Sequence, residues 1–204
     1  MFDELLAHPG VEEVSELGST FGFMAYHGGS LEEVTDVVAR EAAARSGASL
    51  YAVVQPPDFR WHIPSTAVRP EHSSALTAFL DHVDVVVTVH GYGRQDFWTT
   101  LLLGGHNRVL AGHLAGHLRA ALPDYTVVTD LDDIPQALRG LHPENPVNLP
   151  RGGGVQLELP PRVRGRSPIW ADWEGPGLVP HTEALIEGLA AAARSWPVTA
   201  TDAR

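Results

Sequence analysis

The chain has 204 residues and a formal net charge of −11, and 44% of its residues are hydrophobic. This length supports about one domain with an apolar core of its own, and the composition excludes disordered and collagen-like proteins. The sequence contains neither cysteine nor lysine. Thiolate metal sites, cysteine nucleophiles and Schiff-base lysines are therefore excluded, so any metal chemistry must use His, Asp and Glu.

The acidic balance argues against nucleic acid as a partner, because neutralising phosphates requires a basic surface and the arginines are dispersed. No apolar run approaches the roughly 20 residues of a membrane-spanning helix, so we expect no membrane partner. The first residues lack the basic and apolar segments of a secretory signal, which favours a cytoplasmic location. Short, evenly spread Pro/Gly stretches predict a single domain over residues 1–204.

Secondary structure is predicted from apolar runs, which indicate strands, and from apolar residues at helical spacing, which indicate helices. In chain order we expect a strand at 21–26, a helix over 30–46, a strand at 50–54, a helix at 73–82, a strand at 83–89, a helix over 107–122, strands at 125–128 and 154–159, and a helix at 182–194. This alternation predicts an α/β protein with a mixed, mostly parallel sheet that is covered on both faces.

Two local patterns refine these elements. Ser30 and Glu33 have the spacing of a capping box, which predicts that the first helix begins there. In the last strand, Val155, Leu157 and Leu159 alternate with Gln156 and Glu158, so that the apolar and polar side chains point to opposite faces.

Two histidines occupy equivalent positions in this arrangement. His27 and His90 each follow an apolar strand directly and precede a glycine. In open α/β sheets, functional groups collect at the carboxyl ends of the strands. A single histidine there is more often structural, whereas two in equivalent places favour a shared site.

Glu32 lies five residues after His27, beyond a glycine turn, so a chain reversal can bring its carboxylate to the imidazole. The helix dipole alone also favours an acidic residue in a first helical turn. A set of His27, Glu32 and His90 with one water would complete a four-coordinate site, and this mixture of donors suits zinc.

Glu158 is an acidic residue within an otherwise apolar strand. It could point to solvent from a half-exposed strand, which the alternation allows. It could also act as the general base that takes a proton from the attacking water and delivers it to the leaving nitrogen. The residues alone leave both interpretations open.

A second histidine cluster competes with this site. His106, His113 and His117 lie along one stripe of the predicted helix, and a His-x-x-x-His pair on a helix can chelate zinc. Leu114 stands where metalloproteases carry their glutamate base, so we expect this stripe to be structural. The sequence has no nucleophile elbow, P-loop or dinucleotide-binding fingerprint.

Four ordered stretches cover about residues 20–165 and are more specific as a set than any one of them alone. They are His27-Gly28-Gly29-Ser30-Leu31-Glu32 with Thr35, Ser49-Leu50-Tyr51-Ala52, Thr88-Val89-His90-Gly91 with Gly104-Gly105, and Asn145-Pro146-Val147-Asn148 leading to the strand at 154–159. Together they resemble the poly-γ-glutamate hydrolase family, which is similar to zinc carboxypeptidases.

The resemblance implies a three-layer α/β/α sandwich of the zinc carboxypeptidase type and hydrolysis of an amide bond. His27, Glu32 and His90 match the zinc ligands of the family, and Glu158 matches its catalytic glutamate. Zinc would polarise the scissile carbonyl, while Glu158 would transfer the proton.

The same resemblance implies an anionic amide or peptide substrate, with poly-γ-glutamate as the first candidate. Arginines would bind its carboxylates, and Arg151, Arg162 and Arg164 lie closest in sequence to Glu158. Glu33-Val34 stands where the family commonly has Pro-Gly, so the entry into the helix is altered. Two alternatives remain, namely a carboxypeptidase or deacylase acting on a small N-acyl amino acid or peptide, and a catalytically silent metal-binding module.

Overall fold

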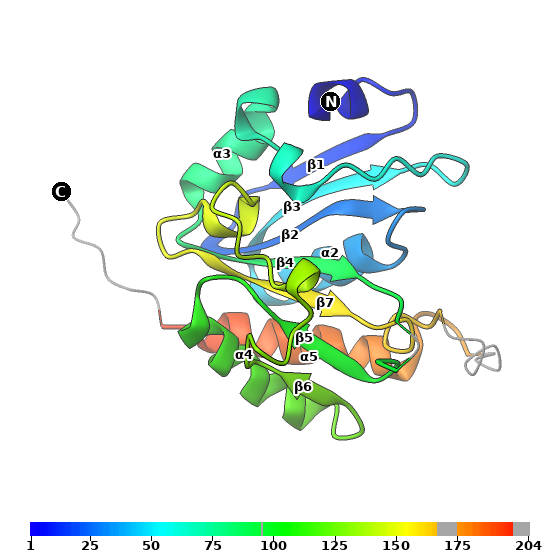
Figure 1. The fold of residues 1–204 in the computed structure, drawn as a ribbon, viewed down its shortest axis with the longest axis vertical. Coiled ribbons are helices and arrows are strands. Elements are labelled where there is room, and N and C mark those ends of the chain that lie inside the picture. Colours follow the sequence, from blue (N-terminus) through cyan, green and yellow to red (C-terminus); the bar gives the residue numbers. More distant parts are fainter. Residues whose placement is uncertain (95, 167–174, 198–204) are drawn as a thin grey trace.

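The computed structural model describes residues 1–94, 96–166 and 175–197, and its centre is a seven-stranded sheet (Figure 1). The order of the strands across the sheet is β1-β3-β2-β4-β7-β5-β6. Their bounds are β1 Glu12–Glu16, β2 Ser19–Gly29, β3 Ala48–Gln55, β4 Val85–Gly91, β5 Thr100–Leu103, β6 Thr126–Val128 and β7 Gly154–Leu159.

The directions of the strands make the sheet mixed and mostly parallel. Strands β3, β2, β4 and β7 are adjacent and run parallel to one another. Strand β1 is antiparallel to β3 at one edge, and the parallel pair β5–β6 runs antiparallel to β7 at the other. The carboxyl ends of β2, β4 and β7 consequently meet at one edge of the sheet, which is where ligands bind in open α/β sheets.

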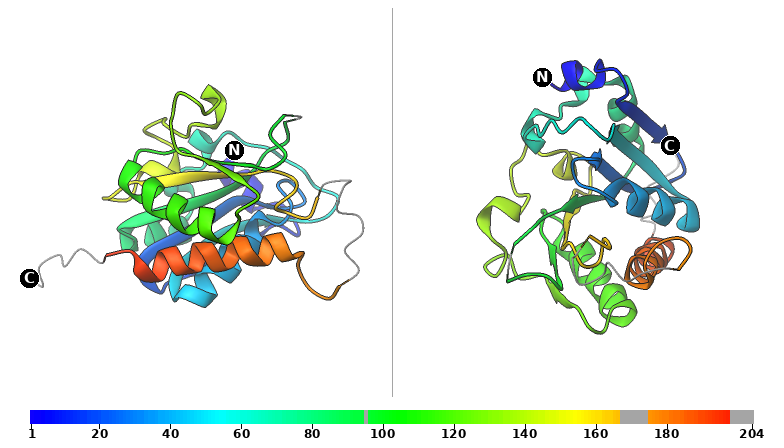
Figure 2. Two further views of the ribbon diagram at one scale, coloured as in Figure 1. Left: turned by 90° about the horizontal axis from the view of Figure 1, so that it is seen from below. Right: turned by 90° about the vertical axis from the view of Figure 1, so that its right-hand side faces the viewer.

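Helices cover both faces of the sheet (Figure 2), which confirms the predicted three layers. One face packs against α2 (Thr35–Ser46), α4 (Arg108–Ala121) and α5 (Pro180–Ser195). The opposite face packs against α1 (Phe2–Leu6), α3 (Ser74–His82) and loop residues. Short 3-10 turns occupy η1 Ser65–Ala67, η2 Pro70–His72, η3 Gln136–Leu138 and η4 Pro146–Asn148.

The apolar pattern of each element matches the face that it buries. Val155, Leu157 and Leu159 of β7 join the core under α2, α4 and α5, which confirms the predicted alternation along this strand. Helix α4 buries its leucines against the same core, and its capping residue Asn107 accepts a hydrogen bond from the Leu110 N–H at 2.8 Å. In the part of the chain that the structure describes, no helix is both long and apolar enough to cross a bilayer.

The start of α2 differs from the prediction. The helix begins at Thr35 rather than at about residue 30, and Ser30 and Glu33 do not form a capping box. The Ser30 hydroxyl instead donates to the Phe59 carbonyl oxygen, and the Glu33 carboxylate pairs with arginines. Val34, the residue before the helix, has a left-handed φ of 77°. Glycine, which the family commonly has at this position, adopts such a φ without steric cost.

Three elements had no prediction, and each depends on distant partners. Strand β1 is a largely exposed edge strand that is rich in glutamate, and helix α1 has only five residues. Strand β5 has four residues and forms only through its pairing with β6 and β7. Segments this short carry too few residues for a periodic signal.

Candidate metal centre

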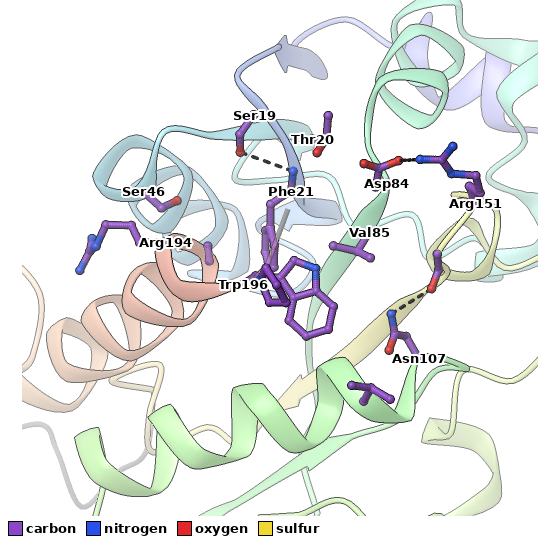
Figure 3. Close-up of a pocket in the computed structure, with 14 residues that line it drawn as sticks. Ser19, Thr20, Phe21, Ser46, Asp84, Val85, Asn107, Arg151, Arg194 and Trp196 are labelled. Carbon is purple, nitrogen blue, oxygen red and sulfur yellow. Dashed lines mark hydrogen bonds and ion pairs between the residues drawn. The ribbon is translucent and has the colours of Figure 1, made fainter. Parts of the chain in front are cut away.

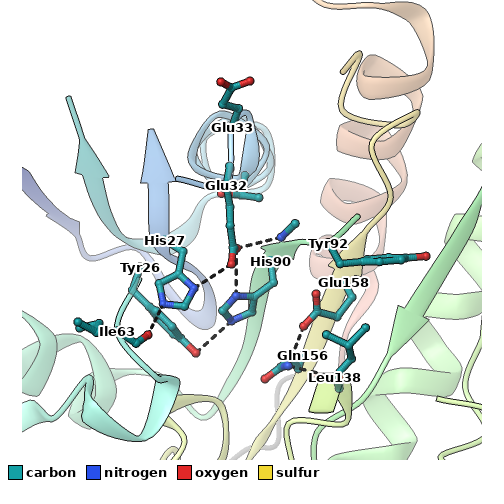
Figure 4. A network of polar contacts seen from close by, with 12 residues as sticks. Tyr26, His27, Glu32, Glu33, Ile63, His90, Tyr92, Leu138, Gln156 and Glu158 are labelled. Carbon is teal, nitrogen blue, oxygen red and sulfur yellow. Dashed lines mark hydrogen bonds and ion pairs between the residues drawn. The ribbon is translucent and has the colours of Figure 1, made fainter. Parts of the chain in front are cut away.

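The candidate metal centre lies at the carboxyl edge of the sheet, where β2, β4 and β7 end side by side (Figure 4). It opens into a pocket of about 610 Å³. His27 is 2% exposed, and His90 and Glu158 are each 4% exposed. The structure thus brings four residues singled out from the sequence to one place, namely His27, Glu32, His90 and Glu158.

An irregularity at the end of β2 turns His27 toward this pocket. Between Ala25 and Gly28 the register with β3 shifts, because β2 contains one more residue than its neighbour. Consecutive side chains in a regular strand point to opposite faces, but Tyr26 and His27 lie on the same side. The ring of His27 is 4.8 Å from the Tyr26 ring and 5.1 Å from the His90 ring, centre to centre.

A tight turn after β2 carries Glu32 back to the strand ends. The Glu32 N–H donates to the His27 carbonyl oxygen at 2.9 Å, and the Thr35 hydroxyl donates to the Glu32 carbonyl oxygen at 2.7 Å. Gly29 has a φ of 69°, and a Cβ at this position would lie 2.1 Å from the Gln55 carbonyl oxygen. The turn therefore requires glycine at position 29.

The Glu32 carboxylate contacts both histidines and the end of β4 (Figure 4). Nδ1 of His27 lies 2.9 Å from one carboxylate oxygen, and Nδ1 of His90 lies 3.1 Å from the other. The Gly91 N–H donates to this second oxygen at 2.9 Å. Each oxygen of Glu32 is therefore directed at one imidazole.

The other nitrogen of each imidazole fixes its tautomer. Nε2 of His27 lies 3.0 Å from the Ile63 carbonyl oxygen, which can only accept, so Nε2 carries the proton. Nε2 of His90 lies 3.0 Å from the Tyr26 hydroxyl, which itself donates to the Asn145 side-chain oxygen at 3.3 Å, so this Nε2 also donates. Both neutral rings then present a lone pair to a carboxylate oxygen, and a proton or a cation between the two atoms is needed to make the contact favourable.

Burial and charge act on these three groups in opposite directions. Burial lowers the pKa of His27, and the Glu32 carboxylate offsets this only in part. Burial also lowers the pKa of His90, but the Glu32 carboxylate raises this pKa by a larger amount. The pKa of His90 is therefore raised overall. Burial raises the pKa of Glu32, but the two histidines lower it by more, so this pKa lies below its usual range.

The donor set fits a divalent metal ion. It consists of two imidazole nitrogens and an ionised carboxylate, which are ligands that zinc accepts. The nitrogens that face away from Glu32 are held by a backbone carbonyl and a tyrosine hydroxyl. Such outer contacts orient metal-binding histidines and raise their basicity.

Glu158 lies beside His90 in the register between β4 and β7. Strand β7 is interior to the sheet and fully buried, so Glu158 does not point to solvent. This excludes one of the two interpretations that the sequence left open. The Gln156 side-chain N–H donates to Glu158 Oε1 at 2.8 Å. Burial raises the pKa of Glu158 to about 7, with smaller effects from His90, which lowers it, and from Glu32, which raises it. A carboxyl group with a pKa near neutrality can both accept and release a proton.

This raised pKa predicts how the stability of the metal-free protein depends on pH. Between pH 4.5 and 7 the folded state binds more protons at Glu158 than the unfolded state does, so its contribution to stability is lost as the pH rises. Relative to a Glu158→Gln variant, the wild type should lose up to about 3 kcal/mol of unfolding free energy across this range. Urea denaturation of both metal-free proteins at several pH values measures the difference. Parallel pH profiles would contradict the raised pKa.

Arg164 lies against the candidate centre. Its Nη1 donates to the Glu33 carbonyl oxygen at 3.0 Å, and its Nη2 donates to the Tyr92 carbonyl oxygen at 3.2 Å. A Cβ at Gly91 would lie 2.7 Å from Arg164 Cζ, so the absence of a side chain there lets the guanidinium pack on the backbone next to His90.

The other two arginines considered from the sequence lie elsewhere. Arg151 forms an ion pair with Asp84 beside a cavity of about 730 Å³ (Figure 3). This cavity is larger than the pocket of the candidate centre, but it lies at the amino ends of β2, β4 and β7, whereas the histidines lie at their carboxyl ends. The guanidinium of Arg162 lies 5.8 Å from the centre of the Tyr125 ring.

Of the three histidines in the second cluster, His113 and His117 lie on α4 and contact α5, whereas His106 precedes this helix and was wrongly placed on it. The Ser195 hydroxyl lies 3.3 Å from His113 Nε2 and 3.0 Å from His117 Nε2, and His113 Nε2 also lies 2.9 Å from the Ala192 carbonyl oxygen. Among the described residues, the side chains grouped closely enough to hold a metal lie at the strand ends and not on α4. This agrees with the structural role expected for the stripe.

His62 is a residue of the site to which the sequence assigned no role. The ligand atoms of His27, Glu32 and His62 all lie within 4.8 Å of one another. His90 is not part of this group of three, although its Nδ1 contacts Glu32 directly. His62 belongs to a loop after β3, where no strand end or helical period marks it.

Comparisons with known sequences point to one family. The sequence profile of poly-γ-glutamate hydrolase matches residues 2–167. The UPF0714 protein YndL of Bacillus subtilis (strain 168) is 31% identical over 147 residues, which are 71% of this chain and 54% of YndL. The chain thus spans about half the length of this curated relative.

Solved structures show the same fold. The bacteriophage poly-γ-glutamate hydrolase matches with a TM-score of 0.72 and 20% identity, covering 90% of this chain and 87% of that chain. The zinc-free form of YndL matches with a TM-score of 0.72 and 22% identity, covering 91% and 90%. A metallo-carboxypeptidase from Burkholderia cenocepacia matches with a TM-score of 0.50 and 10% identity, covering 94% and 65%. The α/β fold of this chain is therefore of the carboxypeptidase-like type.

Proposed function

This chain belongs to the poly-γ-glutamate hydrolase family, and we propose that it is a zinc-dependent amide hydrolase that cleaves γ-glutamyl bonds. The observation that carries the proposal is the convergence of two imidazole Nδ1 atoms on the two oxygens of Glu32. We assign His27, Glu32 and His90 as the zinc ligands, and the single hydrolase domain as residues 1–204. When bound, zinc supplies a Lewis acid that polarises the scissile carbonyl and activates water.

Glu158 is the proposed general base. Its carboxyl group lines the same pocket as the proposed ligands, and its pKa of about 7 is matched to proton transfer near neutrality. The hydrogen bond from Gln156 fixes one of its oxygens and leaves the other to take the proton from the attacking water. Glu158 then passes this proton to the nitrogen of the leaving amine.

The substrate side of the site needs local positive charge, because a chain of net charge −11 repels a polyanion at long range. A cavity of about 310 Å³ beside the turn that carries Glu32 is lined by Arg60, Arg164 and Arg166, and Glu33 is the only carboxylate that lines it among the described residues. Three guanidinium groups against one carboxylate leave this described part of the lining cationic. We assign this cavity, with Arg164 nearest the proposed ligands, to the substrate carboxylates.

Incubation of the purified chain with poly-γ-glutamate tests the proposal. With zinc present, we expect the molecular mass of the polymer to fall, and we expect a chelator to stop this and added zinc to restore it. Poly-α-glutamate of the same length has the same charge but different amide bonds, and should stay intact. Chromatography of the products distinguishes internal cleavage from release of terminal residues.

The opposite outcome is also informative. An intact polymer, together with release of free amino acid from a short N-acyl glutamate, would replace the proposal with a deacylase. No hydrolysis of either substrate by the zinc-loaded chain would favour the catalytically silent module.

A further inference from the structure

The imidazole of His62 stands at the mouth of the candidate centre and has no part in the proposed function so far. It is exposed, whereas His27 and His90 are buried. Its ring centre lies 4.9 Å from that of His27, with the ring planes inclined by 47°. Across residues 1–94, 96–166 and 175–197, no hydrogen bond to this imidazole is found, so its orientation is not fixed by a hydrogen bond in that part of the chain.

The backbone on both sides of His62 is firmly held. The Trp61 N–H donates to the Gln55 side-chain oxygen at 2.8 Å, and the Gln55 side-chain N–H donates back to the Trp61 carbonyl oxygen at 3.0 Å. On the other side, Ile63 is fully buried, and its carbonyl oxygen accepts the proton of His27 Nε2. The loop that fixes the tautomer of His27 therefore also holds the backbone of His62 at the site.

The distances bring His62 within reach of an ion held by the other residues. Zinc–nitrogen and zinc–oxygen bonds of about 2.0–2.2 Å place the donor atoms of a tetrahedral site roughly 3.3–3.6 Å apart. The ligand atoms of His27, Glu32 and His62 already lie within 4.8 Å of one another. A modest side-chain rotation, which an exposed imidazole without hydrogen bonds can make, closes the remaining gap.

We propose that His62 is a labile fourth protein ligand of the metal ion, and that it leaves when substrate arrives. The inference rests on the proposed metal site. Catalytic zinc sites keep one position open, and structural sites are closed by four protein ligands. His62 gives this site both states, since His27, Glu32 and His90 are held by their outer contacts while the imidazole of His62 is free to rotate. The metal is then retained tightly between turnovers, and the open position is restored when substrate displaces His62.

Replacing His62 with Ala tests the proposal by a measurement of metal affinity. Competition with a chromogenic chelator should give a zinc affinity at least about tenfold weaker than that of the wild type, because one of four ligands is lost. The visible absorption of the Co²⁺-substituted variant should also differ, since it reports the number and kind of ligands. Free imidazole added to the variant should return the Co²⁺ spectrum toward that of the wild type.

His142→Ala is the matched control. His142 is also an exposed histidine that lines this pocket, but it is not among the side chains grouped closely enough to hold a metal. This variant should keep the wild-type zinc affinity and Co²⁺ spectrum.

Three results would overturn the proposal, and they can be distinguished. If the wild type binds zinc tightly and His62→Ala matches it in affinity and Co²⁺ spectrum, His62 is not a ligand, while the proposed function stands. A lower turnover of this variant with unchanged metal affinity has the same meaning, and would give His62 a contact with the substrate instead. If the wild type itself binds no zinc, the proposed function and the fourth ligand fail together.

Discussion

Replacing Glu158 with Gln is expected to lower kcat on γ-linked polymer by about 10² to 10⁴-fold, the range that a general acid–base group contributes. Gln keeps the size of the side chain but cannot take the proton from water. It also removes a carboxyl group from a buried position beside His90, so the folded variant should remain stable. Initial rates with the zinc-loaded proteins measure the loss.

The same variant should still bind zinc, because Glu158 is not among the proposed ligands. Elemental analysis should give the wild-type stoichiometry, and the circular dichroism spectrum should be unchanged. Glu144→Gln makes the same chemical change at an exposed residue that pairs with Arg69, and its turnover should match the wild type. Wild-type turnover in Glu158→Gln would show that the proton is transferred by another group.

Replacing His27 or His90 with Ala is expected to remove both zinc and activity. Loss of an outer contact to a metal-binding histidine already weakens metal affinity by about 10 to 100-fold, and loss of the ligand itself should weaken it more. The smaller side chain also leaves one oxygen of Glu32 without its imidazole. Zinc content after dialysis and the rate on γ-linked polymer provide the two measurements.

His113→Ala is the control for these variants. It removes a histidine that contacts α5 on the face of the sheet covered by α2, α4 and α5, and it should leave the zinc stoichiometry unchanged. If this substitution removed the metal while His27→Ala retained it, the metal site would lie on α4 and the assignment at the strand ends would be wrong.

Local sequence signals predicted those parts of the fold that depend on neighbouring residues. Helix α4 begins and ends within a residue of the prediction, because the capping side chain of Asn107 and the spacing of its leucines act within a few turns. The start of α2 was predicted wrongly, because it depends on distant contacts that a local pattern does not contain. Ser30 and Glu33 have the right spacing, but contacts with Phe59 and with arginines far along the chain engage their side chains.

In the candidate site, too, local sequence signals predicted some residues, and distant contacts that the sequence does not reveal place the others. The positions of His27 and His90 follow from strand ends that are visible in the sequence, and the structure brings both to Glu32. The burial of Glu158 follows from the interior place of β7, which depends on the antiparallel pairing with β5 that the sequence did not reveal. His62 reaches the site only because a loop folds back onto Gln55, and no local pattern encodes such a contact.

The extra residue near the end of β2 limits how this segment can change in length. It permits Tyr26 and His27 to face the same side of the sheet. The Tyr26 hydroxyl then contacts His90, and the His27 imidazole contacts Glu32. Deleting a single residue between Ala25 and Gly28 would restore regular alternation and rotate the imidazole of His27 into the apolar layer under α2. The length of this segment is therefore constrained as tightly as its side chains, and changes of length are better tolerated in the loops that lie away from these strand ends.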